Sequence, residues 1–190
     1  MTKLYLVRHG ETMDNAAQIM QGQTPGRLND VGIQQAEEVA RKMANDHIDV
    51  FVSSDLYRSM QTCAIIARPH LEAEMHLKGT ADASAFLTED DILQRIETTP
   101  LIRERDWGDF TGKFIPDMKD AKWPDNVETL EKMLSRARNF LTYIKVTYPD
   151  KKVLAVGHGL INKAIQSVFN GKPMNEIPKM GNAEVRIIML

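Results

Sequence analysis

The stretch Lys3-Leu4-Tyr5-Leu6-Val7-Arg8-His9-Gly10 starts as a short apolar run and ends in an arginine, a histidine and a glycine. Apolar runs of this length are typical of strands that are buried on both faces of a parallel sheet. The chain contains further runs of the same kind at residues 50–53, 153–157 and 184–190. We therefore predict that these runs form one sheet, and that the first strand delivers Arg8 and His9 to its edge.

Segments with apolar residues at helical spacing separate these strands. Asn29 or Asp30 can cap a helix over residues 31–44, and Gly171 closes a helix over residues 159–170. Further helices are predicted for residues 57–67, ending before Pro69, for residues 89–97 and for residues 127–148. Strands that alternate with helices predict an α/β three-layer sandwich. Its sheet should be mostly parallel, with helices on both faces and the last strand antiparallel at an edge.

Residues 79–126 do not follow this alternation. They contain Pro100, Pro116 and Pro124, several glycines and many acidic side chains. This composition indicates an excursion over the sheet rather than another strand-helix unit, and we expect it to form a lid or cap. The sequence shows no repeat or linker that would divide it, so we predict a single domain over residues 1–190.

The overall composition argues against several classes of partner. The chain of 190 residues has 24 lysines and arginines against 26 aspartates and glutamates, and its net charge is −2. Because like charges are not clustered, we expect neither nucleic acid nor a membrane surface as partner. The apolar runs are far shorter than the ~20 residues that span a bilayer. Cys63 is the only cysteine, which favours the reducing cytoplasm. The predicted edge strand favours a homodimer.

Charged and polar side chains gather where the predicted strands end. Arg8 and His9 follow the first strand, Arg58 lies shortly after the second, and His158 follows the run at residues 153–157. Ligands of parallel α/β sheets bind at the carboxyl ends of the strands, so these side chains should meet. A single histidine at a strand end is more often structural than catalytic. Two histidines with two arginines are harder to explain in that way, and they predict a phosphate site.

Such a set of side chains suits phosphoryl transfer, in which the equatorial oxygens carry negative charge. Arg8 and Arg58 can contact these oxygens, and the N–H groups that start the helix after His158 would add partial positive charge. His9 can attack phosphorus if it is neutral, and adjacent cations lower the pKa of a histidine. Gly10 would let the backbone approach the ring or the phosphate closely. His158, if protonated, would donate a further hydrogen bond.

A leaving group needs a proton donor, and Glu104 is the candidate. Apolar neighbours could desolvate its carboxyl group and keep a proton on it near neutral pH. These neighbours in the sequence are Ile102, Trp107 and Phe110. The alternative is that Glu104 and Arg105 form a solvated surface pair without a catalytic role.

Several ordered blocks of the sequence resemble one family. The blocks are residues 6–12 (Leu-Val-Arg-His-Gly-Glu-Thr), Asn15, Gln21-Gly22, residues 28–36, residues 53–62 (Ser-Ser-Asp-Leu-Tyr-Arg-Ser-Met-Gln-Thr), residues 101–112 and residues 156–159 (Val-Gly-His-Gly). In this order they resemble the histidine phosphatase superfamily, which includes cofactor-dependent phosphoglycerate mutases and many small phosphatases. The resemblance covers most of the chain and implies a phosphoglycerate mutase-like fold.

The resemblance also implies an activity and a set of roles. The expected protein is a metal-independent phosphomonoesterase that forms a phosphohistidine on His9, uses no cofactor and acts on a small-molecule phosphate ester. Thr111 and Gly157 depart from the family pattern, in which many small phosphatases have glutamate and serine there. The implied catalytic residues are His9, Glu104, Arg8, Arg58 and His158, and the implied substrate contacts are Asn15, Gln21, Gly22, Arg105, Gly159 and Leu160.

Two other functions stay open. Glu104-Arg105 followed by Gly108 also resembles the corresponding block of phosphoglycerate mutases. Mutases usually carry longer insertions and a C-terminal tail, whereas this chain ends with its last strand at Leu190, so we expect hydrolysis instead. The other alternative is a module that binds phospho-ligands without turnover. The presence of both His9 and Glu104 weighs against it, because binding alone needs neither a nucleophile nor an acid.

Overall fold

A five-stranded sheet forms the centre of the computed structural model, which describes residues 1–77, 79 and 86–190. The strand order is β3-β2-β4-β1-β5. Neighbouring strands run parallel except at the edge, where β5 pairs antiparallel with β1. The strands are β1 (Lys3–Arg8), β2 (Val50–Ser54), β3 (Glu97–Thr99), β4 (Lys152–Gly157) and β5 (Val185–Met189).

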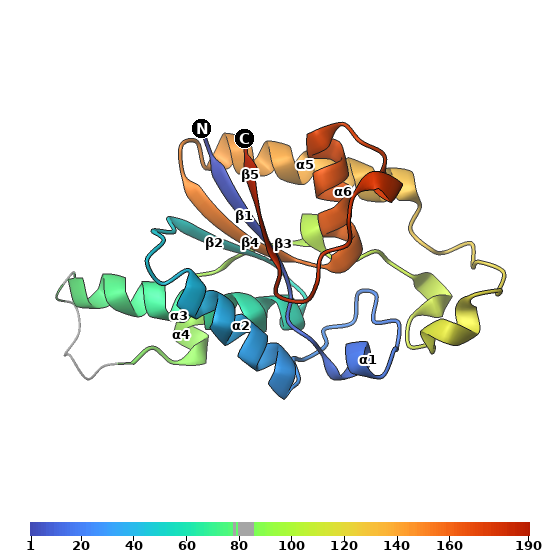
Figure 1. Ribbon diagram of the computed structural model, residues 1–190, viewed down its shortest axis with the longest axis horizontal. Helices are drawn as coiled ribbons and strands as arrows, with labels where there is room; N and C mark the ends of the chain where they lie inside the picture. Colours follow the sequence, from blue (N-terminus) through green and yellow to red (C-terminus); the bar gives the residue numbers. More distant parts are fainter. Residues whose placement is uncertain (78, 80–85) are drawn as a thin grey trace.

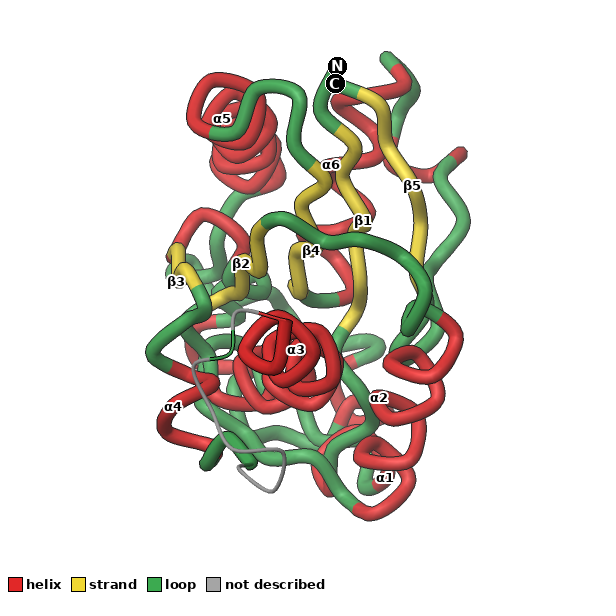
Figure 2. Tube along the Cα trace, turned by 90° about the vertical axis from the view of Figure 1, so that its left-hand side faces the viewer, coloured by secondary structure: helices red, strands yellow, loops and turns green. Residues whose placement is uncertain are grey.

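Helices cover both faces of the sheet, as the views in Figures 1 and 2 show. The helices α2 and α3 lie on one face, and α5 and α6 lie on the other. The predicted three-layer α/β fold with a mostly parallel sheet is therefore confirmed. The helices are α1 (Met13–Ala16), α2 (Asp30–Lys42), α3 (Tyr57–Leu77), α4 (Glu89–Leu93), α5 (Leu130–Thr147) and α6 (Gly159–Asn170), and short 3₁₀ turns cover Pro100–Ile102, Gly108–Phe110, Ile115–Met118 and Met174–Glu176.

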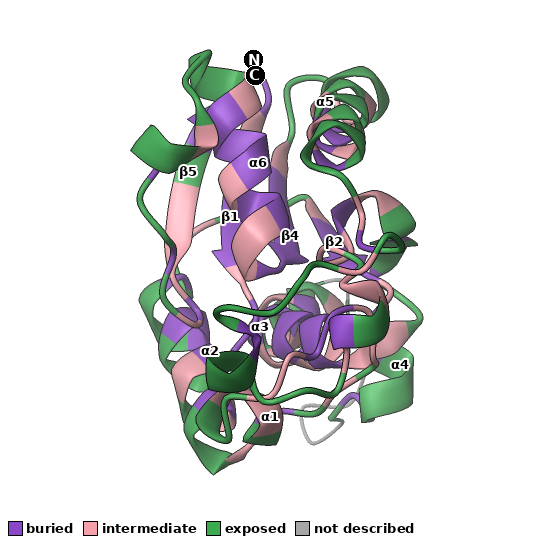
Figure 3. Ribbon diagram, turned by 90° about the vertical axis from the view of Figure 1, so that its right-hand side faces the viewer, coloured by how far each residue is buried: buried purple, intermediate pink, exposed green. Residues whose placement is uncertain are grey.

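The two faces of the sheet carry separate apolar cores because side chains alternate along a strand. In β1, Tyr5 and Val7 join the core under α2 and α3, whereas Leu4 and Leu6 join the core under α5 and α6. Figure 3 shows β1 and β4 as buried strands, with a largely buried α6 in front of them and with α5 exposed on its outer side. Burial on both sides explains why the first strand reads as a continuous apolar run.

Three predicted helix boundaries were wrong. The helix α3 does not end before Pro69 but continues to Leu77. Proline removes one helical hydrogen bond, yet the second half of α3 still buries Leu71 in the core, which offsets the loss. The helix α5 starts at Leu130, where Thr129 caps it by accepting a hydrogen bond from the backbone of Lys132. The helix predicted for residues 89–97 stops at Leu93.

Residues 97–99 form a strand that the sequence analysis missed. This strand, β3, pairs in parallel with β2 and extends the sheet on the side opposite β5. For residues 79–126 we expected an excursion over the sheet rather than another strand-helix unit, and β3 corrects this expectation at residues 97–99. Such a short strand has too few residues to show a period of two, and its pairing with β2 decides its conformation.

The remainder of this segment, residues 100–126, runs beside the loop that follows β1. Met20 donates its N–H to Lys113 O at 2.9 Å, and Gly112 donates to Met20 O at 2.7 Å. Ile19 and Phe114 form an isolated β-bridge. These contacts join residues 18–22 and 107–115 into one wall near the carboxyl end of β1. The predicted lid over residues 79–126 stays a prediction, and residues 78 and 80–85 lie outside the described part of the chain.

Two glycines bring α2 against the segment after β1. A Cβ on Gly10 would lie 2.5 Å from Gly32 O, and a Cβ on Gly32 would overlap with the carbonyl oxygen of Glu11. The close approach expected at Gly10 therefore concerns the backbone of α2, and not the ring of His9 or a phosphate. Asn29 N donates to Glu11 O at 3.0 Å and ties the start of α2 to the same segment.

We predict that Gly32→Ala destabilises the protein by about 2 kcal/mol or more, because overpacking outweighs the better helix propensity of alanine. Chemical denaturation would measure the free energy of unfolding. Gln34→Ala, at an exposed position of the same helix, should change it by less than roughly 0.5 kcal/mol. A stabilised Gly32→Ala protein would contradict the contact.

Candidate active site

His9 lies directly after β1 and is held from two sides. Its N–H donates to Gly157 O of the neighbouring strand at 3.0 Å. Its ring Nδ1 lies 2.7 Å from Gly10 O, and the side chain is only 3% exposed. A carbonyl oxygen can only accept, so Nδ1 must carry the proton. In the neutral ring the lone pair is therefore on Nε2.

The surroundings of His9 favour this neutral ring. Burial holds the pKa of His9 well below its usual value of 6.5, and the positive charges of Arg58 and Arg8 lower it further, although the hydrogen bond to Gly10 acts in the opposite direction. The sequence analysis expected the lowering from the adjacent cations, and the structure makes burial the larger cause.

His158 lies beside His9, and the ring centroids are 5.1 Å apart. It ends β4 and occupies the N-cap position of α6. Its Nε2 lies 2.9 Å from Ser54 Oγ and 3.1 Å from Ser59 Oγ. Burial lowers the pKa of His158 well below 6.5, and Arg58 and His9 add to the effect. The structure therefore favours a neutral His158, where the sequence analysis considered a protonated one.

Arg58 is buried almost completely, with 1% exposure, in the first turn of α3. Its Nη2 donates to Gly22 O at 2.7 Å, and its Nη1 donates to the carbonyl oxygens of Thr24 and Pro25. Burial lowers its pKa to about 10, so the guanidinium stays charged at neutral pH. The guanidinium therefore organises the loop at residues 22–25 through its Nη atoms.

Arg8 ends β1, and its Nη1 donates to Met180 O at 2.7 Å. Burial lowers its pKa, and the carboxylate of Glu104 partly offsets this. Its Nε is buried without a hydrogen-bond partner, as are Arg58 Nε and His158 Nδ1, when all described residues are considered. Buried donors are normally paired, so the Nε groups of Arg8 and Arg58 are suited to an acceptor such as a bound anion.

Glu104 lies at the N-terminus of α6, and not in the apolar pocket that the sequence analysis expected. Its Oε1 accepts N–H groups from Arg105 at 2.9 Å, Leu160 at 3.2 Å and Ile161 at 3.3 Å, and its Oε2 also accepts from Leu160. The expected apolar neighbours are occupied elsewhere, because Ile102 and Phe110 belong to two hydrophobic cores.

The start of α6 therefore binds a carboxylate of the protein itself. The sequence analysis assigned these N–H groups to the phosphate, but Leu160 donates to Glu104 instead. Gly159 is still close to the charged groups, because a Cβ there would lie 3.5 Å from Arg8 Nε and 3.7 Å from Glu104 Oε2. Arg8, Glu104 and the α6 terminus thus meet at one point.

Of the other residues predicted to contact the substrate, two are buried and one helps to cap a helix. Gly22 is buried with a φ of +53°, and it lies against Arg58 through its carbonyl group. Gln21 is buried beside it, and its Oε1 has no hydrogen-bond partner among the described residues. Asn15 forms a capping box with Thr12 at the start of α1.

Arg105 makes its contacts away from the side chains that are predicted to bind phosphate. Its Nε donates to Glu128 O at 2.8 Å, and its guanidinium stacks on the rings of Trp107 and Trp123 at 4.8 and 4.9 Å. Neither a solvated pair of Arg105 with Glu104 nor a direct contact with Arg8 is observed among the described residues. The cation–π contacts stabilise the wall beside the site.

The sequence analysis missed several supporting residues. Ser54 and Ser59 lie in the block at residues 53–62 that resembles the family, but we predicted no role for them from the sequence. Arg136 of α5 donates to Leu101 O at 2.8 Å and to Arg103 O at 2.9 Å, and it forms an ion pair with Glu128. These contacts fix the backbone that carries Glu104. No sequence pattern around these serines, or around an arginine within a helix, would predict such contacts.

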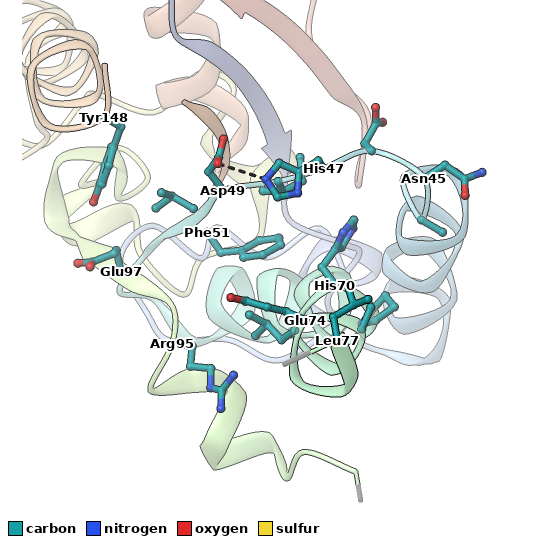
Figure 4. A pocket seen from close by; sticks show the side chains of 17 residues that line it. Asn45, His47, Asp49, Phe51, His70, Glu74, Leu77, Arg95, Glu97 and Tyr148 are labelled. Carbon is teal, nitrogen blue, oxygen red and sulfur yellow. Dashed lines mark hydrogen bonds and ion pairs between the residues drawn. The ribbon is translucent and has the colours of Figure 1, made fainter. Parts of the chain in front are cut away.

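A separate hollow lies elsewhere, at the opposite end of β2. Its volume is about 680 Å³, and it is lined by residues of the 44–51 segment, of the second half of α3 and by Tyr148. Figure 4 shows His47 and Asp49 as an ion pair at its rim. None of the predicted catalytic residues lines this cavity. One unpaired buried nitrogen of the described residues, His70 Nε2, belongs to the lining of this cavity, whereas Arg8, Arg58 and His158 each contribute one beside His9.

Comparison with known proteins agrees with this geometry. A sequence model of the histidine phosphatase superfamily (branch 1) matches residues 4–79 and 78–190. PhoE of Bacillus subtilis (strain 168), named an uncharacterized phosphatase, is 32% identical over 188 residues, which cover 96% of this chain and 86% of PhoE. The chain belongs to the histidine phosphatase superfamily, and the predictions of this family and of a phosphatase are confirmed.

Two further similarities differ in extent. The probable phosphoglycerate mutase GpmB of Yersinia pestis (strain Pestoides F) is 51% identical over 67 residues, which are 35% of this chain and 31% of GpmB. A mycobacterial glucosyl-3-phosphoglycerate phosphatase, solved in complex with VO3, has a TM-score of 0.78 at 22% identity. The alignment covers 97% of this chain and 91% of that one, and it shows a shared fold.

We predict that acid weakens the fold through the buried histidines. The pKa values of His9 and His158 lie well below 6.5 in the folded state, and unfolding returns them to about 6.5. The unfolded state therefore binds protons first, and stability that is present above pH 6.5 is lost as the pH falls below it. The expected slope is about 1.4 kcal/mol per pH unit for each histidine.

Denaturation between pH 7.5 and 5 would measure this slope. His158→Gln should lower this slope by the contribution of one histidine, because one proton fewer is taken up on unfolding. His76→Gln, at an exposed position near the end of α3, should leave the slope unchanged. A free energy of unfolding that stays constant over this range would contradict the buried neutral state of the two rings.

Proposed function

We propose that the protein hydrolyses phosphomonoesters through a phosphohistidine formed on Nε2 of His9. One observation carries this proposal: neutral His9, with its lone pair on Nε2, lies beside His158 and close to the charges of Arg58 and Arg8, whose Nε groups are buried without a partner among the described residues. A tetrahedral anion would supply the acceptors that these donors lack, and a neutral imidazole beside it can act as a nucleophile.

The proposed reaction has two steps. In the first, the Nε2 lone pair of His9 attacks phosphorus, the bond to the ester oxygen breaks, and that oxygen takes a proton from the carboxylic acid form of Glu104 to leave as an alcohol. In the second, water attacks phosphorus, its proton passes to the carboxylate of Glu104, and the bond between nitrogen and phosphorus breaks to release phosphate. Glu104 is assigned this role because its Oε2 lies close to Arg8 and Gly159.

Charge neutralisation in both steps is assigned to the protein. Arg8 and Arg58 would offset the charge on the equatorial oxygens, which is the role that metal ions play in other phosphoryl-transfer enzymes. We therefore propose catalysis without a metal ion. This proposal rests on the donors that the site contains.

The proposed substrate is a small-molecule phosphate ester. The name of the mycobacterial structural relative, a glucosyl-3-phosphoglycerate phosphatase, is consistent with such a substrate. The expectations that neither nucleic acid nor a membrane is a partner, and that β5 mediates a homodimer, stay predictions. No helix among the described residues is long and apolar enough to cross a membrane. We propose the cytoplasm as the location, supported by Cys63, a free and buried thiol.

The test is phosphate release from a panel of phosphomonoesters in excess chelator. We expect metal-independent turnover that His9→Ala lowers at least ~1,000-fold, because the nucleophile is lost. Glu104→Gln should slow alkyl esters roughly 100-fold or more but p-nitrophenyl phosphate much less, because a good leaving group needs no proton.

The matched control is His47→Ala, a histidine on the rim of the remote cavity, which should retain the wild-type rate. A radiolabelled phosphoryl group trapped on the wild-type protein in acid-labile form, and absent from His9→Ala, would support the intermediate. Unchanged turnover in His9→Ala would overturn the proposal.

A mutase is the second candidate, favoured by the 51% identity to GpmB over 67 residues. It predicts that phosphoglycerate isomerises in the presence of a bisphosphoglycerate primer, while little free phosphate appears. Our proposal predicts the reverse. Following the ³¹P spectrum of phosphoglycerate with and without primer separates the two, since isomer and inorganic phosphate give different signals.

A further inference from the structure

His158 has two ring nitrogens with different surroundings. Its Nε2 lies close to the hydroxyl groups of Ser54 and Ser59, at 2.9 and 3.1 Å. Its Nδ1 is buried and has no partner among residues 1–77, 79 and 86–190. The nitrogen that carries the proton therefore decides whether His158 presents a donor or an acceptor to a bound phosphoryl group.

The hydrogen bonds of Ser54 bear on this choice. Its Oγ accepts the N–H of Leu56 at 3.2 Å, so the hydroxyl proton needs another acceptor. Within the described part of the chain, His158 Nε2 is the acceptor within reach of that proton. Ser54 is completely buried, and a buried donor without an acceptor costs about 1–3 kcal/mol. This cost favours an arrangement in which the Ser54 hydroxyl donates its proton to His158 Nε2.

Ser59 imposes a weaker constraint on the same nitrogen. Its hydroxyl lies 3.5 Å from Gly157 O as well as 3.1 Å from His158 Nε2. Its proton therefore has a second acceptor, at the outer limit of a hydrogen bond. Ser59 can point its proton either way, so it can replace Ser54 in part but does not select a proton position on its own.

We infer that Ser54 is a positioning residue that holds neutral His158 with its single proton on Nδ1, so that His158 donates a hydrogen bond to a phosphoryl oxygen without carrying a positive charge. The inference rests on the function proposed for His9. His9 carries its proton on the same nitrogen, because Nδ1 faces Gly10 O. The two rings thus have the same tautomer but opposite roles toward the phosphoryl group. His9 offers its lone pair, and His158 offers its proton.

The direct test is ¹⁵N NMR of the full chain labelled at histidine. The signals of His158 are assigned by their loss in His158→Gln. In the wild type at pH 7.5 we expect Nε2 to be the unprotonated nitrogen. Ser54→Ala should raise the share of the Nε2-protonated form, and Ser54→Ala/Ser59→Ala should raise it further, because the remaining donor is also removed.

Activity provides the second measurement. Ser54→Ala should lower kcat/KM about tenfold and weaken inhibition by inorganic phosphate by a similar factor, as for the loss of one hydrogen bond. The matched control is Ser53→Ala. Ser53 is equally buried and adjacent, but its hydroxyl donates to Ser54 O at 2.8 Å and does not contact His158. It should change neither the tautomer nor the rate by more than twofold.

Two results would overturn the inference. One is a wild-type spectrum in which Nδ1 is the unprotonated nitrogen, and the other is an unchanged tautomer and rate in both Ser54→Ala and the double variant. Failure of the proposed function would be distinguishable from either, because the tautomer is measured without turnover. Hydrolysis that persists in His9→Ala would reject the phosphohistidine and leave the tautomer result in place.

Discussion

The parallel pairing of β1 with β4 is the constraint on which the rest of the site depends. Its register places Arg8 opposite Gly157, so the residues that follow the two strands, His9 and His158, come side by side. A hydrogen bond from His9 N to Gly157 O continues this pairing one residue beyond β1. Apolar cores on both faces fix the register, because a slip by one residue would exchange the faces of every side chain in β1.

The buried charge of Arg58 organises a second part of the site. Arg58 cannot remain ionised in the interior without partners, and the loop at residues 22–25 supplies carbonyl oxygens to its Nη atoms. The same logic applies at α6, where the free N–H groups of the first turn are satisfied by the carboxylate of Glu104. Structural hydrogen bonds thus position two charged groups beside His9.

The unpaired nitrogens around His9 then indicate where a ligand binds. Arg8 Nε, Arg58 Nε and His158 Nδ1 are buried on residues close to His9, whose bond to Gly10 leaves the lone pair on Nε2. A buried donor is costly unless an acceptor binds beside it. The cost is consistent with a site preorganised for an anion, in which little rearrangement is needed when charge develops on the phosphoryl oxygens.

Local sequence patterns specify the strands that lead to Arg8, His9 and His158, the helix that carries Arg58, and the edge of the sheet at which these residues meet. These features follow from local apolar periodicity and from the rule that parallel strands present their carboxyl ends together. The pairing that makes residues 97–99 a strand was decided by the tertiary structure. Tertiary contacts also determine the continuation of α3 through Pro69, the donors around Glu104 and the contact of Ser54 with His158. Each depends on groups far apart in the chain, as Glu104 and Leu160 are, and only packing brings such groups within hydrogen-bond distance.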